Sequence, residues 1–439
     1  MPTDPLRQAL DHHRQGRLDD AAEAYRAMLQ ASTDDAEALH YLGVCRHQQG
    51  LHDEALQLLH RCLRVAPDDA GARNDLGNVL YALQRFDESA MAFEASLGLS
   101  PGQHAVWTSL GAAQREAGLP DDALASFGQA IALQPEYVPA LQHLAQLHDA
   151  AGDAVLASHY HCRAFVLPPL EGKSFEMRGT AFYFLQRFDE AAKVYRDWLA
   201  AEPGHAVAEH MLAACSRATE APARASDGYL ERHFDRFADH FDANLLGSLG
   251  YRGPALIGIG LAIACPDLVE RAFDAVDLGC GTGLCGPVIA PYSRSIIGVD
   301  LATKMLEKAA ERGLYDRLEK AEIGEFLARR PAAFDLAVAA DTLIYIGALD
   351  SLFAHLAVAL RERGLFLFTI ECTTDEDVAP HGVCLHASGR YRHSADHVRQ
   401  CLLAQGMELT HWQPEPLREE LGRPVAGALC VARKRGSLS

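Results

Sequence analysis

Residues 273–283, FDAVDLGCGTG, decide the fold of the second half of this 439-residue chain. The apolar segment 273–278 predicts a buried strand, and three alternate glycines follow it directly. Glycines at 279, 281 and 283 allow a tight turn and let a ligand lie against main chain, because no Cβ stands in the way. The helix predicted next, over 284–291, would present free N–H groups and its positive dipole end at this turn, which suits an anionic group.

Further along the chain, short apolar segments alternate with helical patterns. Strands are predicted at 273–278, 295–300, 317–323, 334–340, 364–370, 407–412 and 427–433, with helices at 284–291, 303–313, 350–362 and 395–405. This alternation predicts a parallel sheet that is covered on both faces, in a Rossmann-like α/β fold. Since no helix separates the last two strands, we expect a seven-stranded sheet that ends in an antiparallel hairpin.

The first half of the chain repeats with a period of 34 residues. The pair Leu42-Gly43 recurs at 76–77, 110–111 and, as Leu-Ala, at 144–145, while prolines recur at 67, 101, 135, 169 and 203. Small residues fall where two helices must approach closely, and each proline falls where the second helix must stop. This pattern resembles the tetratricopeptide repeat (TPR), which implies six helix pairs over about residues 2–205 and a capping helix over 206–217. Such all-α arrays form a superhelix, and the resemblance implies a groove that binds a peptide or protein.

The composition and the repeat pattern indicate the domain boundaries and argue against several kinds of partner. We expect a TPR array at 1–217, a linker at 218–226 and an α/β domain at 227–439. The chain has 40 Lys and Arg against 59 Asp and Glu, a net charge of −19, which argues against a nucleic-acid partner. The longest apolar run, 255–265, is too short to span a membrane, so we expect no membrane partner. Eleven cysteines without a CxxC pair predict reduced thiols, a cytoplasmic location and no metal site.

The glycine turn and the acid after the second strand predict a nucleoside cofactor. Asp300 stands where a carboxylate accepts both hydroxyls of a ribose. The spacing Gly281-x-Gly283-x-x-Gly286 also fits a dinucleotide, although that string alone is weak evidence. Three features favour S-adenosylmethionine: Asp277 just before the glycines, a single strand–helix series, and the closing hairpin.

This half resembles the class I S-adenosylmethionine-dependent methyltransferases, and more closely the bacterial TPR-containing ones. The resemblance rests on DLGCGTGLCGPVIAPY (277–292), IIGVDLATKMLEKAAERGLYDRLEKAEIGEFL (296–327), FDLAVAADTLIYIGAL (334–349) and GRYRHSADHVRQCLLAQGM (389–407). It implies that the cofactor contacts Asp277, Gly279, Cys280, Gly281, Asp300, Leu301, Met305, Glu322 and Ile323. Asp277 would hold the amino group, and Asp300 the ribose. Leu301 and Met305 would flank the adenine, although ordinary helix packing explains them equally well.

The resemblance also implies residues around the acceptor. Asp341 follows the fourth strand, where family members meet the methyl group, but it could equally cap a helix. The upstream segment 229–251 would cover the cofactor through Tyr229 or Phe241, unless it simply packs on the domain. Methyl transfer is an in-line displacement that depends on alignment, and a base is needed only for a protonated acceptor. Candidate catalytic residues after the fifth strand are His386, Arg390, Tyr391 and His393, and Arg390 could also pair with an acceptor carboxylate.

The sequence favours a cytoplasmic methyltransferase whose array recruits a peptide, protein or carrier-bound acceptor. A small natural product is the alternative acceptor, with the repeats used for docking or dimerisation. A scaffold whose methyltransferase domain is inactive or senses the cofactor is the third hypothesis. A homodimer stays open, as do the acceptor and the methylated atom.

Overall fold

The computed structural model describes residues 5–216, 221–238, 241–243, 245, 247, 249–379, 381–420 and 422–436. The chain forms two compact units, Met1–Glu171 and Gly172–Ser439. Among the described residues, no helix is long and apolar enough to cross a bilayer. The expected boundary at 217/218 follows the repeat pattern and stays a prediction, and residues 217–220 of that region lie outside the described residues.

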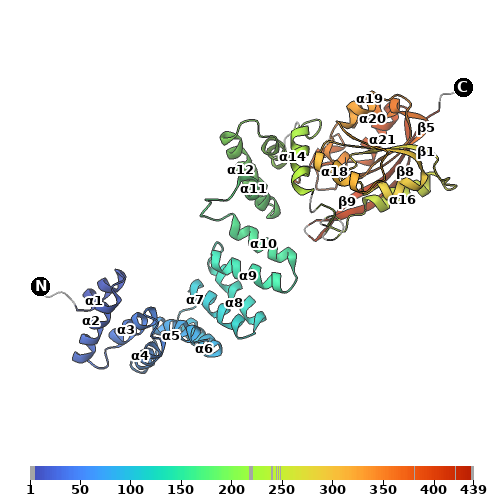
Figure 1. The fold of residues 1–439 in the computed structure, drawn as a ribbon. Helices are drawn as coiled ribbons and strands as arrows, with labels where there is room; N and C mark the ends of the chain where they lie inside the picture. Colours follow the sequence, from blue (N-terminus) through green and yellow to red (C-terminus); the bar gives the residue numbers. More distant parts are fainter. Residues whose placement is uncertain are drawn as a thin grey trace. The chain divides into compact units, whose positions relative to one another are not determined.

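The first unit is built from α-helices that pair in hairpins (Figure 1). They are α1 (Pro5–Arg14), α2 (Leu18–Ala31), α3 (Ala36–Gln48), α4 (His52–Val65), α5 (Ala70–Ala82), α6 (Phe86–Leu99), α7 (His104–Glu116), α8 (Pro120–Leu133), α9 (Val138–Ala150) and α10 (Ala154–Phe165). Successive hairpins stack through α2 on α3, α4 on α5, α6 on α7 and α8 on α9. The prediction of an all-α repeat region is confirmed.

The repeated glycines hold the two helices of each hairpin close together. A Cβ on Gly77 would lie 2.6 Å from the ring of Phe93, and one on Gly111 would lie 2.8 Å from the ring of Phe127. Both rings are buried, so each fills the space that its glycine leaves open. Some of the helices also begin at a side-chain cap: the Asp69 carboxylate, before α5, accepts a hydrogen bond from the Ala72 N–H at 2.9 Å.

The second unit opens with α11 (Phe175–Phe184), α12 (Phe188–Ala201) and α13 (Ala206–Cys215). Three further helices lead to the sheet: α14 (Asp227–Phe237), α15 (Phe241–Ala243) and α16 (Gly253–Ala264). The last repeat pair and its capping helix therefore belong to the same compact unit as the sheet.

A seven-stranded sheet forms the centre of the second unit, in the order β3-β2-β1-β4-β5-β9-β8 (Figure 1). Its strands are β1 (Phe273–Leu278), β2 (Ser293–Asp300), β3 (Arg317–Lys320), β4 (Phe334–Ala339), β5 (Leu360–Glu371), β8 (Met407–Glu420) and β9 (Arg423–Lys434). Strands β1 to β5 are parallel, whereas β9 pairs antiparallel with both β5 and β8. The predicted α/β sheet with its closing hairpin is confirmed.

Helices cover both faces of this sheet. One face packs on α16 and α17 (Gly286–Ile289), through residues that include Leu261 and Ile289. The other packs on α19 (Ile323–Ala328), α20 (Leu349–Ala359) and α21 (Ala395–Ala404). The remaining elements are α18 (Thr303–Glu311), the 3₁₀ turns η2 (Ala290–Tyr292) and η3 (Leu343–Tyr345), and a small hairpin of β6 (Val383–Leu385) and β7 (Tyr391–His393).

Candidate active site

A cavity of about 270 Å³ lies where the carboxyl ends of β1, β2 and β4 meet. The chain leaves β1 toward β2 on one side and returns to β4 on the other, and such switch points are where open α/β sheets bind ligands. The predicted residues that line the cavity are Asp277, Gly279, Gly281, Asp300, Leu301, Met305, Glu322, Ile323, Asp341 and Arg390.

The glycine turn is tied to the second strand by a carboxylate. The N–H of Gly281 donates to Oδ2 of Asp300 at 2.9 Å, and the N–H of Ala302 donates to Oδ1 at 2.8 Å. Gly279 has a φ of 68° and Gly281 a φ of 53°, which glycine adopts readily. Each carboxylate oxygen thus keeps a lone pair for a further donor, and the turn is held in shape by the protein itself.

Asp277, at the end of β1, is a buried carboxylate with one side-chain partner. It is 2% exposed, and the hydroxyl of Tyr315 donates to its Oδ2 at 2.7 Å. The pKa of Asp277 is raised to about 7: burial raises it most, the hydrogen bond from Tyr315 lowers it, and the nearby Asp300 raises it slightly. A cationic ligand group would therefore stabilise the ionised form. Nothing in the sequence pattern singled out Tyr315.

The upstream helices α14 and α15 close one side of the cavity. Leu230, His233, Phe234 and Phe241 line it, and Met305 packs against both phenylalanines. The hydroxyl of Thr282, in the glycine turn, donates to Asp242 of α15. These contacts place α14 and α15 against the glycine turn and α18, which is where a segment that covers the cofactor would have to lie. The side chain of Phe237, also on α14, lies outside the described residues.

Two expected cofactor residues do not line this cavity. Tyr229 is 3% exposed and its ring lies 4.1 Å from that of His210 on α13, so it packs away from the glycine turn. Cys280 is buried, and its Sγ would lie 3.0 Å from a Cβ on Gly298 of β2. Their side chains are corrected from cofactor contacts to packing positions. Glu322 lines the cavity but also caps α19, accepting from the Glu325 N–H at 2.8 Å.

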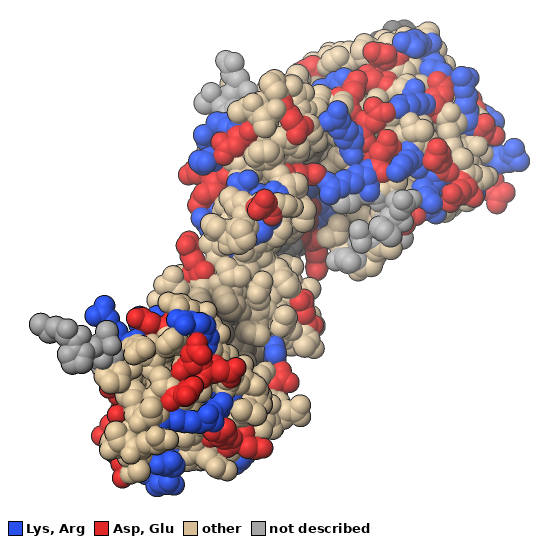
Figure 2. All heavy atoms as spheres, turned by 60° about the vertical axis from the view of Figure 1, so that its left-hand side comes forward, with Lys and Arg blue, Asp and Glu red and all other residues tan. Residues whose placement is uncertain are grey.

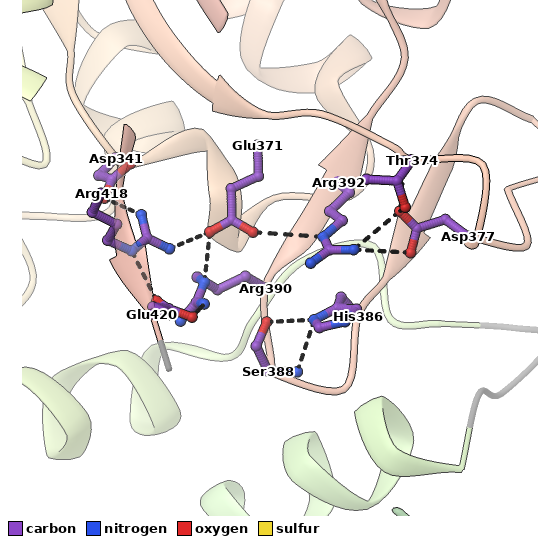
Figure 3. A network of polar contacts seen from close by, with 10 residues as sticks. All are labelled: Asp341, Glu371, Thr374, Asp377, His386, Ser388, Arg390, Arg392, Arg418 and Glu420. Atoms are coloured by element: carbon purple, nitrogen blue, oxygen red, sulfur yellow. Dashed lines mark hydrogen bonds and ion pairs between the residues drawn. The ribbon is translucent and has the colours of Figure 1, made fainter. Parts of the chain in front are cut away.

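The other end of the cavity holds a buried ionic network (Figure 3). Nη1 of Arg418 donates to Asp341 at 2.6 Å and its Nε to Glu420 at 2.8 Å, while Nη2 donates to Glu371. Arg390 donates through Nε to Glu371 at 2.6 Å and through Nη2 to Glu420. Arg418 and Glu371 are 4% and 0% exposed in their side chains. The sequence analysis identified Arg390 and Asp341 but missed Arg418, Glu371 and Glu420.

Asp341 occupies a strained position in this network. Its φ is 56°, in the left-handed region that non-glycine residues rarely adopt, and its N–H donates to Thr369 at 2.9 Å. Burial raises the pKa of Asp341, whereas the ion pair with Arg418 opposes that shift. The expected alternative, a helix cap, is wrong because Thr342 precedes η3 and the Asp341 carboxylate pairs with Arg418 instead.

Comparison with known proteins adds to this geometry. A family model described as a methyltransferase domain matches residues 276–366, which contain β1, the glycine turn, Asp300 and Asp341. This region is a methyltransferase domain. A tetratricopeptide repeat model matches residues 12–70 and 46–113.

The methyltransferase domain also has curated relatives. The chain is 34% identical over 99 residues to the probable S-adenosylmethionine-dependent methyltransferase CRG1 of Saccharomyces cerevisiae, a match that covers 21% of this chain and 34% of that protein. It is 37% identical over 93 residues to methyltransferase-like protein 27 of Homo sapiens, covering 21% and 37%. The chain thus spans about a third of the length of these relatives.

Two solved structures of different proteins are similar to parts of this chain at low sequence identity. A crystal structure of MamA is 22% identical, with a TM-score of 0.34, over 36% of this chain and 91% of that one. A putative S-adenosylmethionine dependent methyltransferase from Listeria monocytogenes is 21% identical, with a TM-score of 0.33, over 41% of this chain and 99% of that one.

Three of the expected catalytic residues lie outside the cavity of the methyltransferase domain. His393 is fully buried, with Nε2 2.9 Å from the carbonyl oxygen of Ile346, and burial lowers its pKa to about 3. His386 binds Ser388 at 2.9 Å, and burial lowers its pKa to about 4. Tyr391 donates its hydroxyl to the carbonyl of Pro222 at 2.6 Å. These side chains stabilise the β6–β7 hairpin, and such weakly basic histidines are poor general bases near neutral pH.

The turn that carries Arg390 is held by the capping helix of the repeats. Nε2 of His210 on α13 lies 2.8 Å from the carbonyl oxygen of Gly389, the residue before Arg390. A Cβ on Gly389 would lie 2.9 Å from Sδ of Met211, also on α13. Helix α13 therefore supports the end of the cavity that holds the ionic network. The described residues contain no group of three or more His, Cys, Asp or Glu side chains that could hold a metal ion.

Proposed function

We propose that this protein is an S-adenosylmethionine-dependent methyltransferase whose TPR array recruits a peptide, protein or carrier-bound acceptor. One observation carries the cofactor assignment: the glycine turn is fastened to a carboxylate at the tip of the adjacent strand, with both facing one cavity. The methyltransferase family match and the relative named as S-adenosylmethionine-dependent support the same cofactor.

The residues present fit this cofactor. A Cβ on Gly281 would meet no atom within 4 Å, so main chain at this point borders open cavity that a ligand can enter. Asp277 offers a carboxylate to an ammonium group, and Asp300 offers lone pairs to two hydroxyls. Met305 and Leu301 offer an apolar wall to a base. When bound, S-adenosylmethionine would supply an electrophilic methyl group on a sulfonium.

The protein's own contribution is binding, alignment and exclusion of water. The helices α14 and α15 cover the cavity with apolar and aromatic side chains, which lowers the local polarity. The ionic network around Arg418 fixes the wall opposite the glycine turn. Fixing the positions of the reactants in advance is the main source of rate acceleration in an in-line displacement.

The repeats support a polypeptide acceptor. Residues 1–216 carry 16 basic and 29 acidic residues, so the array suits a partner with positive groups. On the face shown in Figure 2, Lys and Arg side chains are interspersed with Asp and Glu on both units, without one large basic area. A nucleic-acid backbone would require such an area.

Isothermal titration of S-adenosylmethionine into the full chain tests the cofactor assignment. We expect Asp300→Ala to weaken binding at least about tenfold, because the ribose loses its acceptor. The matched control is Asp396→Ala on α21, whose side chain is 83% exposed and pairs with Arg399. Unchanged affinity in Asp300→Ala, or equal losses in both variants, would refute the assignment.

A small-molecule acceptor is the second candidate, because the second unit contains every residue that lines the cavity. Deleting residues 1–171 removes only the first unit and leaves α11–α13 in place. If labelled methyl transfer to a lysate survives that deletion undiminished, the recruiting role of the array is wrong. If the full chain binds cofactor but labels nothing, including itself, a cofactor-sensing scaffold is the better description.

A further inference from the structure

The ionic network at the acceptor end contains more acid than base. Asp341, Glu371 and Glu420 surround Arg390 and Arg418, while Arg392 pairs with Asp377 at 3.1 Å. Nε of Arg392 also lies 3.8 Å from Glu371, so the four carboxylates and three arginines of this network together carry a formal charge of −1. This negative charge lies at a cavity that is lined by aromatic rings, where electrostatic interactions are stronger than in water.

One carboxylate oxygen of the same network faces no donor in the described part of the chain. Oδ1 of Asp341 is buried without a hydrogen-bond partner among the described residues, whereas Oε2 of Glu371 lies 3.8 Å from Nε of Arg392 (Figure 3). In contrast, all three nitrogens of Arg418 bind carboxylates, as do Nε and Nη2 of Arg390. Glu371 and Glu420 thus occupy the Nε–Nη2 edge of Arg390, so the expected bidentate pairing with an acceptor carboxylate would have only its Nη1–Nη2 edge.

This imbalance selects the chemistry of the acceptor. An anionic acceptor would add a further negative charge beside these carboxylates, and the arginine N–H groups left to bind it belong to cations that are already paired with carboxylates. An amine would instead bring N–H donors and, when protonated, the missing positive charge. The rings of Phe234, Tyr251 and Tyr345 line the same cavity, and aromatic faces attract cations.

We propose that the methyl acceptor is an amine, and that Asp341 determines this specificity by accepting an N–H hydrogen bond through Oδ1. The inference rests on the proposed methyltransferase function and names its substrate class. Asp341 is suited to this role because Arg418 holds its other oxygen and Thr369 holds its main chain.

Methyl transfer to an amine needs no reactant other than the amine and the methyl donor. A protonated amine first gives one proton to the Asp341 carboxylate, which frees its lone pair. That pair forms the new N–C bond while the C–S bond breaks and its electrons stay on the sulfur, which becomes a neutral thioether. The nitrogen then carries the positive charge, and Asp341 passes its proton to solvent on opening of the cavity.

Binding of two matched probes tests this proposal on the full chain saturated with S-adenosylhomocysteine. The probes are 1-butylammonium and butanoate, which have the same length and opposite charge, and the readout is titration calorimetry. We expect 1-butylammonium to bind at least about tenfold more tightly than butanoate, and Asp341→Asn to remove that preference. Asparagine tolerates a positive φ, so this variant keeps the backbone, and Asp396→Asn is the control.

A second measurement needs no variant and no known acceptor. Label transferred from the methyl-labelled donor to a lysate is treated with mild alkali, which hydrolyses methyl esters and leaves N-methyl groups intact. Alkali-stable label that co-elutes with methylated amines supports the proposal. Alkali-labile label, equal or tighter binding of butanoate, absent binding of 1-butylammonium, or an unchanged preference in Asp341→Asn would each overturn it. If S-adenosylhomocysteine itself fails to bind, the proposed function falls as well.

Discussion

Removal of one imidazole on α13 should loosen the acceptor end of the methyltransferase domain. His210 is 5% exposed, and its Nε2 binds the carbonyl of Gly389 at 2.8 Å. Burial lowers the pKa of His210, so near neutral pH the ring is uncharged and Nε2–H is the donor. In His210→Ala the Gly389 carbonyl stays buried without a partner, and the ring of Tyr229 loses its neighbour at 4.1 Å.

The expected magnitude follows from these two losses. An unsatisfied buried carbonyl costs about 1–3 kcal/mol, and the cavity left by the ring adds about 1 kcal/mol. A loss of about 2–4 kcal/mol lowers the protection of the local amides about 30-fold or more. Hydrogen exchange of peptides that cover the β6–β7 hairpin, Val383–His393, measures this directly.

Two further variants separate the hydrogen bond from simple loss of volume. His210→Gln keeps a donor near the position of Nε2 and should restore at least half of the lost protection. His161→Ala, in the first unit, is the control because that ring is 54% exposed and should cost less than about 0.5 kcal/mol. Unchanged exchange in His210→Ala, or equal effects of Ala and Gln, would show that α13 does not hold this turn.

Three other perturbations have definite expected results. Because burial raises the pKa of Asp277 to about 7, the folded protein binds a proton that the unfolded chain releases near pH 4; stability in urea should therefore fall between about pH 4 and pH 7, and Asp277→Asn should abolish this slope. Gly111→Ala places a Cβ 2.8 Å from the Phe127 ring and should lower the stability of the array by about 1–3 kcal/mol, whereas Gly128→Ala, where a Cβ meets nothing within 4 Å, should stabilise it slightly. Arg418→Met leaves buried carboxylates without their shared cation and should cost about 3–5 kcal/mol in thermal unfolding, and a smaller loss would mean that water reaches the network.

Local sequence patterns predicted most of the fold. The bounds of β1, 273–278, follow from a mostly apolar segment that is directly followed by glycine, and the repeat follows from small residues at fixed spacing. The expected third strand, 317–323, ends early at Lys320 because Glu322 caps α19. The strand expected at 407–412 is too short: β8 continues to Glu420 despite Pro414 and Pro416, since an edge strand tolerates residues that lack an N–H.

The acceptor end was harder to predict than the cofactor end. The glycine turn and Asp300 lie close in sequence, so their spacing carries the signal. Arg418 and Glu371 come from different strands, and only the tertiary fold brings them together, 47 positions apart. The histidines at 386 and 393 were chosen because imidazole suits proton transfer, but His393 is buried against the carbonyl of Ile346 and His386 is paired with Ser388, contacts that residue type does not reveal.

The two ends of the cavity are encoded by separate stretches of the chain. Under the proposed function, most residues that would hold the methyl donor lie in segment 277–305, whereas the other end of the cavity is assembled from the tip of β5, the β6–β7 turn supported by α13, and the final antiparallel ribbon β8–β9. Substitutions in that ribbon or in α13 can thus change which substrate is methylated without disturbing the methyl donor.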